Sequence, residues 1–125
     1  MKKLQSNFTT PEQSKRLLEI GVPADSADCI MKNNEHVYKY NFDMEPTMTQ
    51  LIERLNTDDY SHVYNPCWSV GRLIEILMIC GNGDDVKFFY YEGINIMDFA
   101  IRQIEVELKY DRLDFSKLND YETTE

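Results

Sequence analysis

The residues best suited to covalent chemistry lie near the middle of the chain. Cys67 follows His62 by five positions, and Asp58 and Asp59 precede both. A cysteine nucleophile needs a base within hydrogen-bond reach, and usually a third group that orients the base. A small cysteine-dependent enzyme that uses Cys67 and His62 is therefore one hypothesis. The two residues belong to no motif of a cysteine-protease family, however, and a buried cysteine typically acts as a small core residue. We expect Cys67 to be structural and the protein not to be an enzyme.

Metal and cofactor sites have little support in the pattern. The metal-ligating candidates are His36, His62, Cys29, Cys67 and Cys80. A closed zinc site needs four ligands, usually in closely spaced pairs, and the closest pair here is His62 with Cys67. Residues 81–85 (GNGDD) lack the alternating ligands and the glutamate of a calcium loop. We expect no metal and no cofactor.

A run of aromatic residues forms the main candidate binding surface. Residues 86–91 (VKFFYY) favour a strand, and they place aromatic rings on both of its faces. An uncovered aromatic face is typical of a surface that binds another protein or a second copy of the chain. The residues of this predicted interaction surface are Phe88, Phe89, Tyr90 and Tyr91. Stacking on nucleic-acid bases would need surrounding Lys and Arg, so a nucleic-acid accessory protein is an alternative that the charge disfavours.

Size and charge restrict the classes of function. The chain has 125 residues, a net charge of −9, 42% hydrophobic residues and 28% charged residues. These values are typical of one soluble globular domain, and the negative charge works against binding to a phosphate backbone. Three cysteines without a C-x-x-C pair indicate reduced thiols in the cytoplasm, and we see neither a signal peptide nor a membrane span. We expect one domain over residues 1–118 and a frayed acidic tail at 119–125.

Helix signals are strongest in the first half of the chain. Thr10 as N-cap, Pro11 and Gln13 form a capping box, and Gly21 ends the helix in a left-handed turn. Residues 25–32 (DSADCIMK) predict a second short helix, residues 36–42 a strand, and residues 47–56 a further helix.

The stretch NPCWSVGRLIEIL, residues 65–77, predicts a buried helix. Ser69 is the preferred N-cap, with Trp68 and Leu73 at the spacing of a hydrophobic staple. An alternative start has Asn65 as N-cap and Pro66 in the first turn. Asn95 caps a last helix, and residues 113–118 dock through Leu113, Phe115 and Leu118.

Together these elements predict an α+β fold, with four to five helices packed on a small two- to three-stranded antiparallel sheet. Residues 37–42 and 86–91 are the expected strand pair, because both are rich in aromatic residues.

Four stretches resemble a family of small proteins from prophages and mobile genetic elements of gut anaerobic bacteria. They are FTTPEQSKRLL at 8–18, VPADSAD at 22–28, PCWSVGRL at 66–73 and DFSKL at 114–118. Residues 35–64 match the family poorly. The resemblance implies a bacterial cytoplasm and an accessory role in a mobile element, and it implies no activity, cofactor or site residue. We therefore expect a small acidic cytoplasmic protein that binds another protein or itself.

Overall fold

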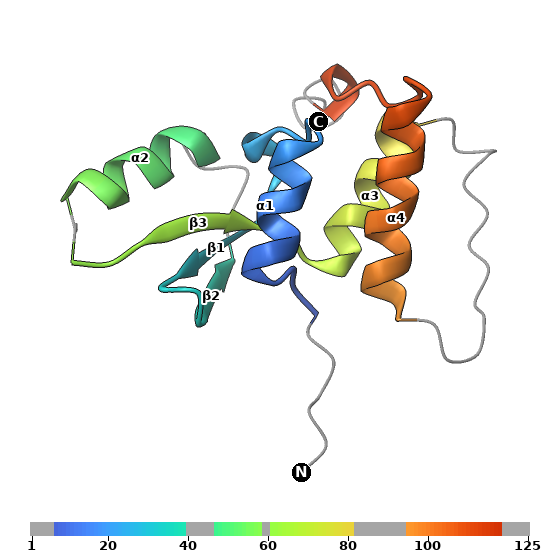
Figure 1. Cartoon of the computed structure of the whole chain (residues 1–125). Coiled ribbons are helices and arrows are strands. Elements are labelled where there is room, and N and C mark those ends of the chain that lie inside the picture. Colours follow the sequence, from blue (N-terminus) through green and yellow to red (C-terminus); the bar gives the residue numbers. More distant parts are fainter. Residues whose placement is uncertain (1–6, 40–46, 59–60, 82–94, 119–125) are drawn as a thin grey trace, which may run out of the picture.

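The chain combines helices with one small antiparallel sheet, which confirms the predicted α+β class. The computed structural model describes residues 7–39, 47–58, 61–81 and 95–118. Within them the helices are α1 (Pro11–Glu19), the 3₁₀ turn η1 (Ala24–Ser26), α2 (Met48–Asp58), α3 (Val70–Cys80) and α4 (Ile96–Lys109). The strands β1 (Cys29–Lys32), β2 (His36–Lys39) and β3 (Tyr64–Cys67) form a sheet in the order β2-β1-β3. Figure 1 shows α2 beside β3 at one end of the molecule, and α3 with α4 at the other end.

Helix α1 has the caps that the sequence predicts. The Thr10 hydroxyl accepts the N–H of Gln13 at 3.1 Å, and the Gln13 side chain accepts the N–H of Thr10 at 2.9 Å. At the other end, Gly21 has a φ of +109°. The N–H of Val22 then reaches back to the C=O of Leu17 at 2.9 Å, which completes a Schellman motif.

The helix predicted over residues 25–32 is wrong for most of its length. Only η1 is helical, and the chain then extends into β1. Cys29, Ile30 and Met31 are all buried, because side chains pack on both faces of β1: Ile30 belongs to the main core cluster, and Cys29 and Met31 belong to a second one. Asn33 has a φ of 54° and Asn34 a φ of 60°, and these values make the tight turn that leads into β2.

The strand predicted over residues 36–42 is confirmed for His36–Lys39, and residues 40–42 lie outside the described part of the chain. The partner that the structure gives to β2 is β1, with Ile30 opposite Tyr38 and Lys32 opposite His36. The predicted partner, residues 86–91, also lies outside the described residues, so that pairing stays a prediction.

Helix α3 begins where Ser69 was expected to cap it. The Ser69 hydroxyl accepts the N–H of Arg72 at 3.1 Å. The alternative start is wrong, because Asn65 and Pro66 belong to β3. Trp68 and Leu73 are both fully buried, as a hydrophobic staple requires.

Helix α4 packs on α3, and its cap is also confirmed. The Asn95 side chain accepts the N–H groups of Met97 and Asp98 at 2.8 and 3.2 Å. After α4 the chain returns over the end of α3, where the N–H of Asp114 donates to the C=O of Cys80 at 3.0 Å. As predicted, this segment docks by its apolar residues: Leu113 and Leu118 are buried and Phe115 packs against the core.

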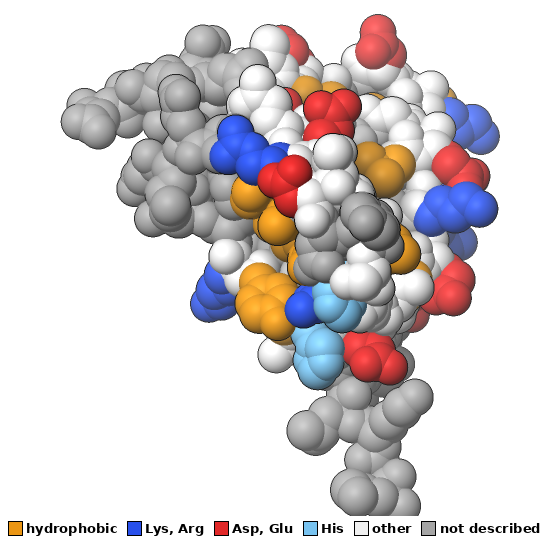
Figure 2. Space-filling view, turned by 90° about the vertical axis from the view of Figure 1, so that its left-hand side faces the viewer, with side chains coloured by type: hydrophobic (Ala, Val, Ile, Leu, Met, Phe, Trp, Pro, Cys, Tyr) orange, Lys and Arg blue, Asp and Glu red, His pale blue; other side chains and the backbone are white. Residues whose placement is uncertain are grey.

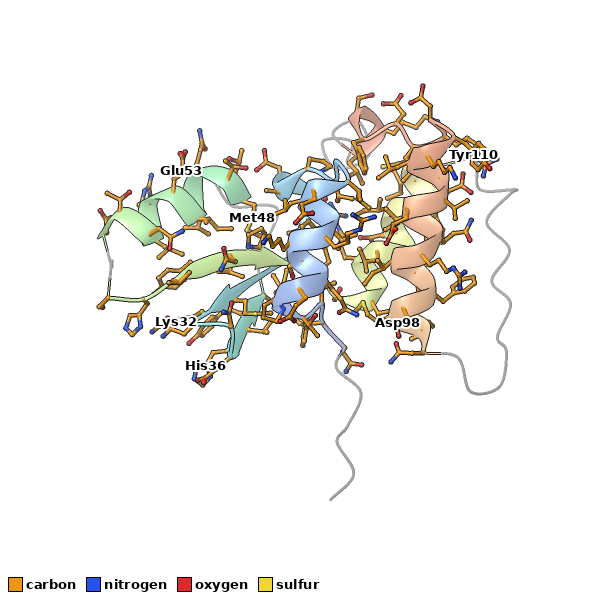
Figure 3. All side chains as sticks on the ribbon, in the orientation of Figure 1. Lys32, His36, Met48, Glu53, Asp98 and Tyr110 are labelled. Carbon is orange, nitrogen blue, oxygen red and sulfur yellow. The ribbon has the colours of Figure 1, made fainter. Side chains whose placement is uncertain are left out.

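The buried residues form one main cluster and one smaller cluster. The main cluster draws on the four helices α1 to α4 and on two of the strands, and Trp68 is its largest fully buried side chain. The smaller cluster lies on one face of the sheet and joins Cys29, Met31 and Cys67, with Phe8 and Val37 packed against it. Figure 3 shows Met48 pointing inward from α2, whereas Glu53 lies on the outer side of that helix. None of the described helices is both long and apolar enough to cross a membrane.

Candidate functional site

The structure does not bring Cys67 and His62 together. Cys67 is the last residue of β3, whereas His62 precedes the first residue of that strand. A four-residue strand alone spans about 10 Å, well beyond the hydrogen-bond reach that a nucleophile and its base require. The His62 ring instead lies 2.8 Å from the Asn33 amide nitrogen, measured from Nδ1, and stands edge-on to Tyr64.

The neighbour of Cys67 is another thiol. Cys29 lies directly opposite Cys67 in the antiparallel register, and both side chains are fully buried. A hydrogen bond with Cys67, burial and the nearby Asp28 carboxylate all raise the pKa of the Cys29 thiol far above its ordinary range. A thiol that stays protonated is a poor nucleophile. The pair therefore has the properties of core residues.

Metal ligands are not clustered in the described part of the chain. No group of three His, Cys, Asp or Glu side chains there could hold a metal ion. The His36 ring has Glu35 as a neighbour, at 3.9 Å between Nε2 and Oε2. Of residues 81–85, which lack the pattern of a calcium loop, only Gly81 is described, and it caps the end of α3.

The predicted aromatic surface is not among the described parts of the chain. Phe88, Phe89, Tyr90 and Tyr91 lie outside the described residues, so their role as an interaction surface stays a prediction. Among the described aromatic residues of the sheet, Tyr38 is 52% exposed.

A buried polar network, which the sequence did not reveal, surrounds Trp68. Its backbone N–H donates to Thr9 Oγ1 at 3.0 Å, and its indole Nε1–H donates to Ser26 Oγ at 3.0 Å. The Ser26 hydroxyl in turn donates to the C=O of Pro23 at 2.6 Å. These bonds join stretches of the chain that lie far apart in the sequence.

The same network continues through the start of α3. Both oxygens of Asp28 accept hydrogen bonds from Ser69, one from the N–H at 2.9 Å and one from the hydroxyl at 2.5 Å. The Arg72 side chain is only 3% exposed, and it donates to the C=O of Ser26 at 2.7 Å and to Glu75 at 2.9 Å. These contacts hold the N-terminus of α3, so the Asp28 carboxylate serves the helix rather than a substrate.

The outer edge of β3 is closed. The N–H of Tyr64 donates to Asn56 Oδ1 at 2.8 Å, and its C=O accepts from Asn56 Nδ2 at 3.0 Å. Backbone groups of alternate residues point to the same side of a strand. The backbone of Pro66 therefore also points away from β1. Because proline has no N–H, this position costs the sheet no hydrogen bond. Just past the strand, the N–H of Thr9 donates to the C=O of Trp68 at 2.8 Å.

The register then determines which way the backbone groups of β2 point. Tyr64 stands opposite Lys32 but bonds outward to Asn56, so this pair exchanges no hydrogen bonds. By alternation, Lys32 directs its own backbone groups to the other neighbour of β1. That neighbour is His36, which therefore points into the sheet.

By the same alternation, the outer edge of β2 has no partner among the described residues, and the predicted pairing with residues 86–91 would use this edge. His36 and Tyr38 bond to β1, which leaves the N–H and C=O groups of Val37 and Lys39 directed away from the sheet. No described residue pairs with this edge. His36, Tyr38 and Lys39 are exposed, and Val37 is half-buried. Figure 2 views this end of the molecule and shows hydrophobic side chains on the same face as the two histidine side chains. The edge is the described feature best suited to binding.

The sequence held one signal for this edge. Asn33-Asn34 is a dipeptide that tolerates positive φ at both positions, so it marks a tight hairpin turn. A hairpin at that point requires a strand on each side of it. The dipeptide therefore favours a strand, and not the predicted helix over 25–32, directly before the turn.

Comparisons with known proteins returned no match: no family model fits the chain, and searches of curated proteins and of solved structures found none that is similar.

Proposed function

We propose that this protein is a protein-binding module, which takes an extended segment of another protein chain along the outer edge of β2. The observation that supports this function is the contrast between the two edges of the sheet. Asn56, Pro66 and the segment around Thr9 close β3, whereas the outward groups of Val37 and Lys39 meet no described residue.

An open edge favours binding for a physical reason. A row of unpaired N–H and C=O groups is a template for another strand. In strand addition the main-chain hydrogen bonds supply affinity and alternate side chains supply specificity. Tyr38, which is 52% exposed, offers apolar area beside the edge, and aromatic residues are enriched at protein interfaces.

The cellular context that we propose for this activity comes from the resemblance to mobile-element proteins. In that setting the module is a non-enzymatic accessory factor in a bacterial cytoplasm. The net charge of −9 is consistent with a protein target rather than a nucleic acid. The distance between Cys67 and His62 gives the cysteine-enzyme alternative no support.

A photo-crosslinking experiment tests this function. The crosslinking amino acid p-benzoylphenylalanine replaces Tyr38 beside the edge or, as a control, Glu53 on the outer side of α2. We expect crosslinks to a defined protein from position 38 in a bacterial lysate, and none from position 53.

Two variants of Val37 make the experiment specific to the edge. Val37→Pro removes an outward N–H without touching the bonds to β1, so it should abolish the crosslink from position 38. Val37→Thr keeps both the N–H and the β-branched shape, and it should preserve the crosslink. Far-UV circular dichroism must show that both variants fold. A crosslink that survives Val37→Pro, or one that forms equally from position 53, would refute binding at this edge.

A further inference from the structure

A partly enclosed hollow lies between α1 and one face of the sheet, and its volume is about 280 Å³. Figure 1 shows α1 beside the end of β3, and the two elements are in contact. The wall of the hollow includes Pro11, Lys15 and Leu18 from α1, Met31 from β1, Asn34 from the turn after β1, and Asn65 from β3. We propose that this hollow binds a small apolar molecule that carries one carboxylate group.

The apolar part of the wall comes from both the helix and the sheet. Leu18 is 40% exposed, and Pro11 lies on the same face of α1, two turns earlier. Met31 belongs to the smaller core cluster, so the hollow reaches down to the packed interior. Ser14 also lines the hollow, and its hydroxyl lies 2.7 Å from Thr9 Oγ1, so its small side chain leaves space that a longer one would fill. Covering these surfaces with an apolar ligand removes them from water, which favours binding.

Three polar side chains at the hollow have no partner among the described residues. They are the Lys15 ammonium group and the amides of Asn34 and Asn65, which make no hydrogen bond or ion pair within the described part of the chain. Asn65 stands directly opposite Met31 in the register, so both side chains lie on the same face of the sheet. Lys15 lies one turn before Leu18 on α1. The hollow therefore combines apolar walls with one positive charge and two amide groups.

The neighbouring polar side chains of α1 differ from Lys15, because they are already engaged. Gln13 donates to Asp98 at 3.2 Å, and Arg16 donates to Glu105 at 3.3 Å. Both acceptors lie on α4. Lys15 contacts no acid in the described part of the chain, so its charge is available to a ligand.

The polar groups of the hollow match a carboxylate. One ammonium group balances one negative charge, and a carboxylate has two oxygens that can accept from the ammonium and from an amide NH₂ at the same time. A phosphate dianion would bring a second charge, which the apolar walls would leave unpaired at a cost in free energy. A neutral apolar molecule would leave the ammonium group without a partner.

The volume of the hollow indicates the size of the ligand. An engineered cavity of about 150 Å³ binds benzene, and at the same volume per atom 280 Å³ admits about ten non-hydrogen atoms. Phenylacetate has this size and carries one carboxylate, so it is a suitable probe. The hollow is open to solvent on one side, so an occupant stays partly exposed, and we expect a dissociation constant of about 1 mM.

Titration of the full ¹⁵N-labelled chain with phenylacetate, followed by the amide chemical shifts in NMR spectra, tests this site. We expect saturable shifts, nearly complete at about 10 mM, that are centred on the residues of the hollow. Acetate carries the charge without the ring, and phenylacetamide carries the ring without the charge. Each should bind at least about tenfold more weakly than phenylacetate, because each lacks one of the two matched parts.

Variants of Lys15 test the charge directly. Lys15→Met keeps an apolar side chain of similar length and removes the ammonium group, so it should weaken binding of phenylacetate at least about tenfold. Lys15→Arg keeps the positive charge and should stay within about threefold of the wild type. Lys109→Met makes the same change of charge on α4 and should leave binding unchanged. Both lysines are exposed, so we expect all three variants to fold, and urea unfolding checks this.

The possible results decide the inference in either direction. Shifts that do not saturate or are not centred on the hollow up to about 20 mM phenylacetate would overturn the site. Equal affinity for phenylacetamide, or equal losses in Lys15→Met and Lys109→Met, would overturn the pairing of Lys15 with a carboxylate. No residue of β2 lines the hollow, so this result is separate from the crosslinking test of the strand edge.

Discussion

The indole N–H of Trp68 should depend on a single hydroxyl group for its hydrogen bond. Trp68 is fully buried, and its Nε1–H donates to Ser26 Oγ at 3.0 Å, while Ser26 is only 2% exposed. In Ser26→Ala the indole N–H stays in the core without an acceptor. An unsatisfied buried donor costs about 1–3 kcal/mol, which is more than the net value of the bond itself.

A double-mutant cycle isolates this bond. Trp68→Phe removes the donor and keeps an aromatic ring in the core. In that background Ser26→Ala should cost less than about 1 kcal/mol, because no indole N–H then needs an acceptor. The coupling free energy between the two positions should therefore be about 1–2 kcal/mol. Trp68→Ala should destabilise the chain by about 3–5 kcal/mol through the cavity it leaves.

Urea unfolding monitored by far-UV circular dichroism measures all four variants, since that signal does not depend on tryptophan. Effects of the single changes that add to within about 0.3 kcal/mol would refute the bond between Trp68 and Ser26. A loss below about 1 kcal/mol in Trp68→Ala would place the indole at the surface and make Trp68 a candidate for binding.

Further perturbations test a cap, the thiols and the closed edge of β3. Gly21→Ala should cost about 1–3 kcal/mol in urea unfolding because of its φ of +109°. The matched change Gly71→Ala, where a new Cβ meets only Ser69 Oγ at 3.9 Å, should stabilise α3 by about 0.5–1 kcal/mol, and shifts of the same sign would contradict this contrast. Iodoacetamide should label the three buried cysteines only as the chain unfolds, and rapid labelling of the native protein by mass spectrometry would show otherwise. Folding raises the pKa of the Cys29 thiol above its ordinary value of 9.0, so the unfolded chain loses the thiol proton at a lower pH than the folded chain does. The free energy of unfolding should therefore fall as the pH rises above 9.0, and Cys29→Ala should reduce that pH dependence. Asn56→Ala removes both bonds to Tyr64 and should cost about 1–3 kcal/mol, with a smaller loss for Asn56→Asp, which keeps the acceptor; equal losses would mean that the acceptor contributes nothing.

Local signals predicted the helices well because a helix end is determined within a few residues. The capping box at Thr10, the left-handed turn at Gly21 and the caps at Ser69 and Asn95 all rest on contacts between neighbours in the sequence. The strand β1 could not be found in this way. Its residues are buried on both faces, so they show no alternation of polar and apolar types, and a short apolar run fits a helix equally well.

The candidate site was missed for a related reason. Proximity in the sequence suggested that Cys67 and His62 could act together, but the intervening residues form an extended strand, which separates its ends. The open edge of β2 depends instead on which neighbours β1 and β3 have. That information becomes available only when the register of the whole sheet is known.

The polar network clarifies what the resemblance to mobile-element proteins can imply. Thr9, Ser26, Asp28, Trp68 and Ser69 all lie in or beside the stretches that carry the resemblance, and the structure joins them by hydrogen bonds around the start of α3. Residues of this kind hold a scaffold together, so the resemblance, which stays a prediction, points to the structural part of the chain. The strand β2 lies within residues 35–64, where the resemblance is poor, and the proposed binding at its edge therefore draws no support from the resemblance and rests on the sheet register alone.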